Sequence, residues 1–360
     1  MALKCGIVGL AGVGKTTLFN CISKSKINPD AAKTTNLGQV EVPDLRLDVL
    51  TELIKPAKVV PTTVEIVDIP GLMKNAGTSK GGNQFLADIR QTDAIIHVLR
   101  CFDSDVVPHI EGSVNPVRDK EIIDLELITK DLDTLEKKLY KVEKLVKTGD
   151  KDAKTEYEVL SKLKDHFENG ESARTFKFEE SHKKYIDDCF FITVKPVLYV
   201  CNVDEDSAKE GNEYSRKVKE SFSDENEMIL TIAAQAEADI AELETAEDRE
   251  EFLKDLGLEE PGVNKLIRAA YELLNLKTFF TAGPKEVRAW TFKEGMTAPQ
   301  TAGVIHSDLE RGFIRAEVMK FDDLKELGSE QACKNAGKYF IEGKTYVVKD
   351  ADILNIRFNV

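Results

Sequence analysis

Runs of consecutive apolar residues recur along the first two thirds of the chain and indicate buried strands. They lie at residues 5–8, 63–67, 196–201 and 228–232. Strands covered by helices on both faces are apolar throughout, and a helical pattern follows the first run at residues 18–22. We therefore predict that the fold class is α/β.

Between two of these strands the period changes to that of a long helix. From Leu125 onward, apolar residues alternate at three and four positions and keep one face apolar for about three heptads. These are Ile128, Leu132, Leu135, Leu139, Val142 and Val146. A polar turn at residues 147–152 leads into a second helical pattern, which carries Ala153, Tyr157, Leu160 and Phe167. We predict an inserted antiparallel coiled-coil hairpin.

The lysines beside that turn have two possible functions. They could contact RNA phosphate, or they could form an ordinary solvated helix face. They are Lys141, Lys144, Lys147, Lys151 and Lys154.

The last third of the chain changes to short strands. A helix over residues 262–276 should close the α/β domain, and strands are expected at 287–291, 313–318 and 344–348. The predicted organisation is a discontinuous nucleotide-binding domain (1–118 and 190–277), a helical insertion (119–189) and a C-terminal domain (278–360).

Composition narrows the class of protein. The chain has 360 residues, of which 42% are hydrophobic, enough for two or three domains with real cores. No run of eighteen apolar residues occurs, and its six cysteines show no C-x-x-C pairing. The net charge of −14 argues against broad nucleic-acid affinity. We expect a cytoplasmic protein that binds neither membrane nor DNA.

Candidate chemistry begins at residues 9–17, which read G-L-A-G-V-G-K-T-T after the first strand. This is a P-loop in its usual setting, because glycines let backbone N–H groups turn around phosphate oxygens. Lys15 should reach the outer phosphates as a catalytic residue, and the Thr16 hydroxyl should ligate Mg²⁺. The predicted nucleotide contacts here are Gly12, Val13, Gly14, Lys15, Thr16 and Thr17.

A second motif, D-x-x-G, ends the strand at residues 63–68. Asp68 at a strand tip can hold Mg²⁺ through water, and the Gly71 amide can sense the terminal phosphate. Its place some fifty residues after the P-loop favours a GTPase-like switch module over a kinase or a helicase.

The base-reading element follows the strand at 196–201. GTPases of this fold use N-K-x-D there, whereas this chain has Asn202-Val203-Asp204-Glu205. The lysine is missing and the acid is displaced, so guanine should be read poorly, while the Asn202 amide can pair with either purine. Alternatively, Asn202 only caps the next turn. Val203, Ala233 and Ala234 are further predicted base contacts.

These residues resemble the Obg-like ATPases, the YchF group of P-loop proteins. The resemblance runs from end to end and is carried by residues 4–10, 82–86, 98–102, 202–205, 237–243, 279–283, 285–290 and 358–360. It implies ATP binding in preference to GTP, Mg²⁺ as cofactor, a nucleotide contact at Phe102, and a C-terminal β-grasp module of the TGS type. It also implies the ribosome or ribosomal RNA as partner.

The chain departs from the family pattern at several positions. Gly12 stands where the family commonly has Asn. The first switch also looks shorter than in the family, and either Thr34 or Thr35 could be its Mg²⁺ ligand. We assign Thr35. Leu72 replaces the glutamine that orients water in Ras-like enzymes. The resemblance points instead to His109, whose imidazole can position or deprotonate water. The alternative is a histidine on a mobile surface loop.

The predicted function is slow Mg²⁺-dependent ATP hydrolysis that acts as a switch on the ribosome. A true GTPase of the same fold is one alternative. The other is a non-catalytic ribosome or RNA adapter in which ATP only stabilises the fold.

Overall fold

The chain forms two compact units, each built from two segments of sequence. The computed structural model describes residues 3–27, 35–71, 80–222 and 228–359. Unit 1 contains Met1–Gly38 and Glu65–Leu266, and unit 2 contains Gln39–Val64 and Ile267–Val360. Residues 39–64 thus group with the C-terminal residues, although the sequence pattern placed them in the nucleotide-binding domain. The predicted domain boundaries stay a prediction.

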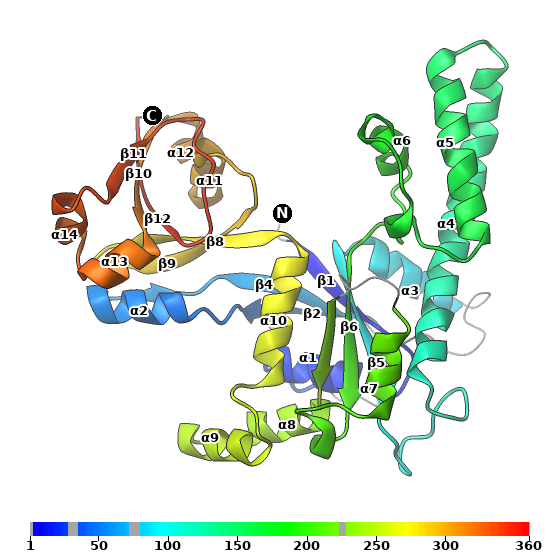
Figure 1. Ribbon diagram of the computed structural model, residues 1–360, viewed down its shortest axis with the longest axis horizontal. Helices are drawn as coiled ribbons and strands as arrows, with labels where there is room; N and C mark the ends of the chain where they lie inside the picture. Colours follow the sequence, from blue (N-terminus) through cyan, green and yellow to red (C-terminus); the bar gives the residue numbers. More distant parts are fainter. Residues whose placement is uncertain (1–2, 28–34, 72–79, 223–227, 360) are drawn as a thin grey trace. The chain divides into compact units, whose positions relative to one another are not determined.

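The first of two six-stranded sheets has the strand order β2-β4-β1-β5-β6-β7 (Figure 1). Its strands are β2 (Asn36–Glu41), β4 (Thr63–Asp68), β1 (Lys4–Val8), β5 (Ala94–Cys101), β6 (Val197–Val203) and β7 (Met228–Ile232). β1 pairs in parallel with β4 and β5, and β6 pairs in parallel with β5 and β7. Every residue of β5 and β6 is buried, as expected for strands with both faces covered. The α/β prediction is confirmed.

The remaining elements of unit 1 are helices. They are α1 (Lys15–Ser23), α3 (Lys80–Arg90), α4 (Pro116–Val146), α5 (Lys151–Glu168), α6 (Lys183–Asp187), α7 (Glu213–Glu220), α8 (Ala234–Glu242) and α9 (Ala246–Asp255), with α10 (Gly262–Leu273) passing into unit 2. No helix among the described residues is long and apolar enough to cross a membrane.

Helices α4 and α5 form the predicted antiparallel hairpin (Figure 1). Ile128, Leu135 and Leu160 from the predicted seam are at the centre of its core. Asn115 caps α4 by accepting from the Arg118 N–H, and Asp150 caps α5. The base of the hairpin is held by Asp131, which is fully buried and accepts three hydrogen bonds of 2.7–2.8 Å from Ile192 and Thr193.

Unit 2 is a second six-stranded sheet with the order β11-β10-β12-β8-β9-β3. The strands are β11 (Tyr339–Glu342), β10 (Phe313–Lys320), β12 (Asp352–Phe358), β8 (Leu276–Ala282), β9 (Val287–Lys293) and β3 (Val59–Val60). The helices are α2 (Leu45–Ile54), α11 (Ala298–Ile305), α12 (Ser307–Arg311), α13 (Phe321–Leu327) and α14 (Glu330–Asn335). Side chains that alternate along the strands of this sheet belong to two separate hydrophobic cores. One includes residues of α2, α13 and α14, and the other includes residues of α11.

One predicted strand is wrong. Residues 344–348 form a turn followed by a single bridge at Val347 rather than a strand. Their backbone bonds go to the segment before α11: the Ala298 N–H donates to Tyr346 O at 2.8 Å, and the Val348 N–H donates to Met296 O at 3.1 Å. Tertiary contacts thus override the local preference of Thr, Tyr and Val for strands.

Candidate nucleotide-binding site

The P-loop connects β1 to α1 and has the backbone that its glycines permit. Gly12 and Gly14 have φ angles of 76° and 95°, which side chains other than glycine rarely adopt. Close packing also excludes a side chain at Gly9, because a Cβ atom there would lie 2.5 Å from Val98 O. Thr17 lies in the first turn of α1.

Lys15, the first residue of α1, is buried within the loop. Its Nζ donates to Leu10 O at 2.6 Å, and its residue is 6% exposed. Burial lowers the pKa of Lys15 to about 8, against the opposing effect of the Asp68 carboxylate. A Cβ atom on Gly71 would lie 2.7 Å from this Nζ, so the glycine of D-x-x-G lies directly against the lysine.

Thr16 and Asp68 meet where the sequence predicts a magnesium site. The Thr16 hydroxyl donates to Asp68 Oδ2 at 3.0 Å, while Asp68 Oδ1 is buried with no hydrogen-bond partner. Burial raises the pKa of the Asp68 carboxyl, although Thr16 and Lys15 lower it. An orphaned buried oxygen beside a hydroxyl fits Mg²⁺, which prefers oxygen ligands and commonly takes only one or two from the protein.

The described residues hold no group of three or more His, Cys, Asp or Glu that could bind a metal by itself. Phosphate and water oxygens would therefore have to complete the coordination of an ion at Thr16 and Asp68.

Thr35 is engaged elsewhere. Its hydroxyl donates to Asp88 Oδ2, and Asp88 also accepts from Gln84 at 2.8 Å. The assignment of Thr35 to Mg²⁺ stays a prediction. Thr34 and Leu72 lie outside the described residues.

The Asn202 side chain connects the P-loop to the start of α8. Its Nδ2 donates to Val13 O at 2.9 Å, and its Oδ1 accepts from the Ala234 N–H at 2.9 Å. The side chain is buried within β6, and the turn that follows β6 is capped by Asp204, so Asn202 does not cap the next turn as the alternative supposed. Val203, Ala233 and Ala234 are buried beside it. One amide hydrogen and one lone pair remain for a base.

The carboxylate of Asp204, the displaced acid, accepts two hydrogen bonds within the protein. Asp204 caps the short 3-10 helix Glu205–Ser207, with its Oδ1 accepting from the Ser207 N–H at 3.0 Å. Its Oδ2 accepts from Asn212 Nδ2 at 3.3 Å. These two bonds hold the Asp204 carboxylate at the start of the 3-10 helix, one position before the place of the acid in N-K-x-D.

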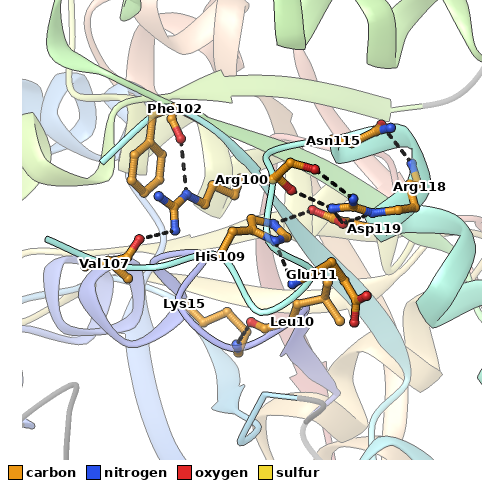
Figure 2. Close-up of polar contacts among 11 residues, drawn as sticks. Leu10, Lys15, Arg100, Phe102, Val107, His109, Glu111, Asn115, Arg118 and Asp119 are labelled. Atoms are coloured by element: carbon orange, nitrogen blue, oxygen red, sulfur yellow. Dashed lines mark hydrogen bonds and ion pairs between the residues drawn. The ribbon is translucent and has the colours of Figure 1, made fainter. Parts of the chain in front are cut away.

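The segment that follows β5 lies against the P-loop and carries His109 (Figure 2). Arg100 is almost fully buried and donates to the carbonyls of Phe102 at 3.1 Å and Val107 at 2.9 Å, with its guanidinium 4.7 Å from the Phe102 ring centre. A Cβ atom on Gly12 would lie 3.2 Å from Val107 Cγ1. Burial lowers the pKa of Arg100 below its usual range.

His109 has a buried imidazole with both nitrogens occupied. Its Nε2 lies 2.8 Å from Asp119 Oδ2, its Nδ1 lies 3.1 Å from the Glu111 nitrogen, and its side chain is only 5% exposed. The alternative of a surface histidine is therefore wrong. Sequence reasoning missed Arg100 and Asp119. A charged residue within the apolar β5 run was a usable signal for Arg100, whereas nothing in the pattern marks Asp119.

A glycine loop after β1, a lysine and a threonine opening α1, and a carboxylate at the tip of β4 together define a P-loop nucleotide-binding protein of the GTPase type. A family model described as "50S ribosome-binding GTPase" matches residues 4–143. A second model, YchF-GTPase_C, described as "Protein of unknown function (DUF933)", matches residues 276–359.

Full-length relatives define the family more narrowly. The chain is 50% identical to the ribosome-binding ATPase YchF of Bacillus subtilis over 100% of both chains. It is 41% identical to Obg-like ATPase 1 of Gallus gallus, over 99% of this chain and 93% of the relative. The solved structure of the Schizosaccharomyces pombe YchF GTPase has a TM-score of 0.88 and 36% identity, covering 99% of this chain and 97% of that one. The chain belongs to the YchF family of Obg-like ATPases.

Proposed function

We propose that this protein is a slow Mg²⁺-dependent ATPase of the cytoplasm that binds the ribosome and prefers ATP to GTP. The observation that carries the proposal is the convergence of Lys15, Thr16 and Asp68, with a buried carboxylate oxygen lacking a partner. The ribosome as partner rests on relatives named ribosome-binding ATPases. The resemblance of the sequence alone supports the assignment of residues 278–360 as a TGS module.

In this mechanism the P-loop binds the phosphates, and Lys15 supplies a charge that is strong because it is desolvated. Thr16 and Asp68 would hold Mg²⁺, which neutralises charge on the phosphate oxygens when bound. Gly71 brings a backbone amide beside the lysine without a side chain to block it. His109 is the side chain to which we assign water positioning.

The preference for ATP rests on how the base-reading residues are used. Guanine requires a carboxylate that accepts from its N1–H and amino group, whereas the Asp204 carboxylate is displaced by one position and is turned toward Ser207 and Asn212. The Asn202 amide keeps one donor and one acceptor, a pair that adenine can match through N6 and N7.

Competition binding tests this preference. ATP and GTP should displace a fluorescent nucleotide analogue from the protein in the presence of Mg²⁺, with ATP at least as effective. A much higher affinity for GTP would refute the ATPase assignment in favour of a true GTPase.

The adapter alternative is favoured by one observation: both nitrogens of His109 are occupied, so this conformation offers no free imidazole lone pair. Single-turnover hydrolysis, with and without ribosomes, separates the two functions. An ATPase with His109 as catalytic residue should lose about 10²-fold in kcat in His109→Ala, with nucleotide affinity nearly unchanged. Hydrolysis that stays at the uncatalysed rate even with ribosomes would leave only the adapter.

A further inference from the structure

The hydrogen bonds of His109 fix its tautomer. A backbone N–H can only donate, so Nδ1, which lies 3.1 Å from the Glu111 nitrogen, must be the unprotonated acceptor. The ring proton is then on Nε2 and is donated to Asp119 Oδ2 at 2.8 Å. The side chains of His109 and Asp119 are 5% and 2% exposed, so water competes little for either bond.

Asp119 is itself held on its other oxygen. Arg118 donates to Asp119 Oδ1 from Nε at 3.1 Å and from Nη2 at 2.8 Å. The same Nη2 donates to Ser113 O at 2.7 Å, which ties the guanidinium to the segment before α4. Since α4 begins at Pro116, the carboxylate that receives the His109 proton belongs to the first turn of the hairpin helix.

The other end of the His109 segment is also fastened. Arg100 holds the carbonyls of Phe102 and Val107, and the Val107 side chain lies against the P-loop at Gly12. The segment is therefore fixed by β5, by the P-loop and by α4. In this arrangement a water molecule cannot give its proton to His109, because a general base needs a nitrogen lone pair that is free.

We propose that Asp119 is a positioning residue that latches His109 in a non-catalytic conformation. Hydrolysis then requires the His109 ring to leave both of its partners, and the charged bond to Asp119 is the stronger of the two restraints, so this bond keeps basal turnover low. The inference rests on the proposed function, in which His109 positions the attacking water. Because α4 continues without a break from Asp119 to the hairpin turn, about 40 Å away, a partner that binds the hairpin can act on the latch through one rigid element.

Asp119→Asn tests the latch. The substitution keeps the shape, but the neutral amide offers one acceptor oxygen in place of two charged ones, which roughly halves the strength of a bond to Nε2–H. We expect basal single-turnover hydrolysis to rise about tenfold, with ATP affinity little changed. The matched control is Asp124→Asn, five residues further along α4, where the carboxylate accepts from Lys120 at 2.8 Å. The control should hydrolyse ATP at the wild-type rate.

The double variant identifies the residue through which Asp119 acts. If Asp119 restrains His109, then Asp119→Asn combined with His109→Ala should be as slow as His109→Ala alone. An Asp119→Asn rate equal to or below that of wild type overturns the latch, whereas the proposed function stands as long as His109→Ala is slow. A wild-type rate in His109→Ala removes the role of His109 itself, and the latch with it.

A spectroscopic measurement makes the test independent of turnover. In protein with ¹⁵N-labelled histidine, the His109 signals, assigned by their loss in His109→Ala, should show the Nε2–H tautomer without nucleotide. Asp119→Asn should leave this tautomer in place, because the Glu111 N–H still donates to Nδ1, but the Nε2–H proton resonance should move upfield as its hydrogen bond weakens. An unchanged Nε2–H proton resonance would count against Asp119 as the restraint. If Asp119→Asn does not fold, Asp119→Glu, which keeps the charge but displaces the carboxylate by one methylene, should also raise the rate. No increase there would overturn the proposal.

Discussion

Alanine at Gly14 should damage the nucleotide site for two separable reasons. The φ angle of 95° is costly for any residue with a Cβ, by about 1–2 kcal/mol. In addition, the new Cβ would lie 2.3 Å from Asn202 Nδ2, a contact that must push the amide aside. Its two bonds, to Val13 O and from the Ala234 N–H, contribute about 1 kcal/mol each, and their buried partners would be left unpaired. We expect a total loss of about 3–4 kcal/mol.

The hairpin turn provides a matched control. Gly149 has a similar φ of 86°, but a Cβ there would meet nothing within 4 Å. Gly149→Ala should therefore show the backbone cost alone and leave nucleotide binding unchanged.

Equilibrium binding of a fluorescent ATP analogue and denaturant unfolding should be measured on both variants. Gly14→Ala should lose at least tenfold in affinity because the P-loop loses its brace, and it should be the less stable variant. Equal stability losses in Gly14→Ala and Gly149→Ala, with normal nucleotide affinity in both, would show that Asn202 does not support the loop.

The remaining predictions concern charge, anchoring and base choice. The pKa of Lys15 is about 8 in the free protein, and bound phosphate should raise it. ATP binding at pH 8 should therefore take up about half a proton, and ATP affinity should fall as the pH rises further. Calorimetry in buffers of different ionisation enthalpy measures this uptake, which should be absent in Lys15→Arg. Asp131→Ala strands three buried donors and should lower the free energy of unfolding by about 3 kcal/mol in urea titrations, whereas the half-exposed Asp133→Ala should change it little. Glu205→Asp should shift competition binding toward GTP if the displaced acid weakens guanine recognition.

The parts of the fold that depend on periodicity were predictable from sequence. The β1 strand, the P-loop, the D-x-x-G strand and the hairpin seam each carry a repeating or spaced pattern that local physics enforces. The strand expected at 344–348 failed because its backbone bonds go to the segment before α11, a contact distant in sequence.

Contacts between distant side chains were beyond sequence reasoning. The pairing of Thr16 with Asp68 follows from the two motifs, but the bond from His109 to Asp119 does not, because an Asp in the first turn of a helix is common for reasons of the helix dipole alone. Likewise, Thr35 carried the expected residue type for a metal ligand, yet its hydroxyl donates to Asp88.

The division of unit 2 between two segments has a consequence during synthesis. Residues 39–64 leave the ribosome about two hundred residues before the rest of unit 2 begins at Ile267. Their core is complete only with Ile353, about 300 residues after Leu50, so at about 5–20 residues per second Leu47 and Leu50 of α2 wait roughly 15–60 s for it. Unit 2 therefore cannot fold vectorially, and the nascent chain carries an exposed apolar helix that invites chaperone binding. A separately produced fragment of residues 278–360 would lack this helix and β3, and we expect it to be aggregation-prone.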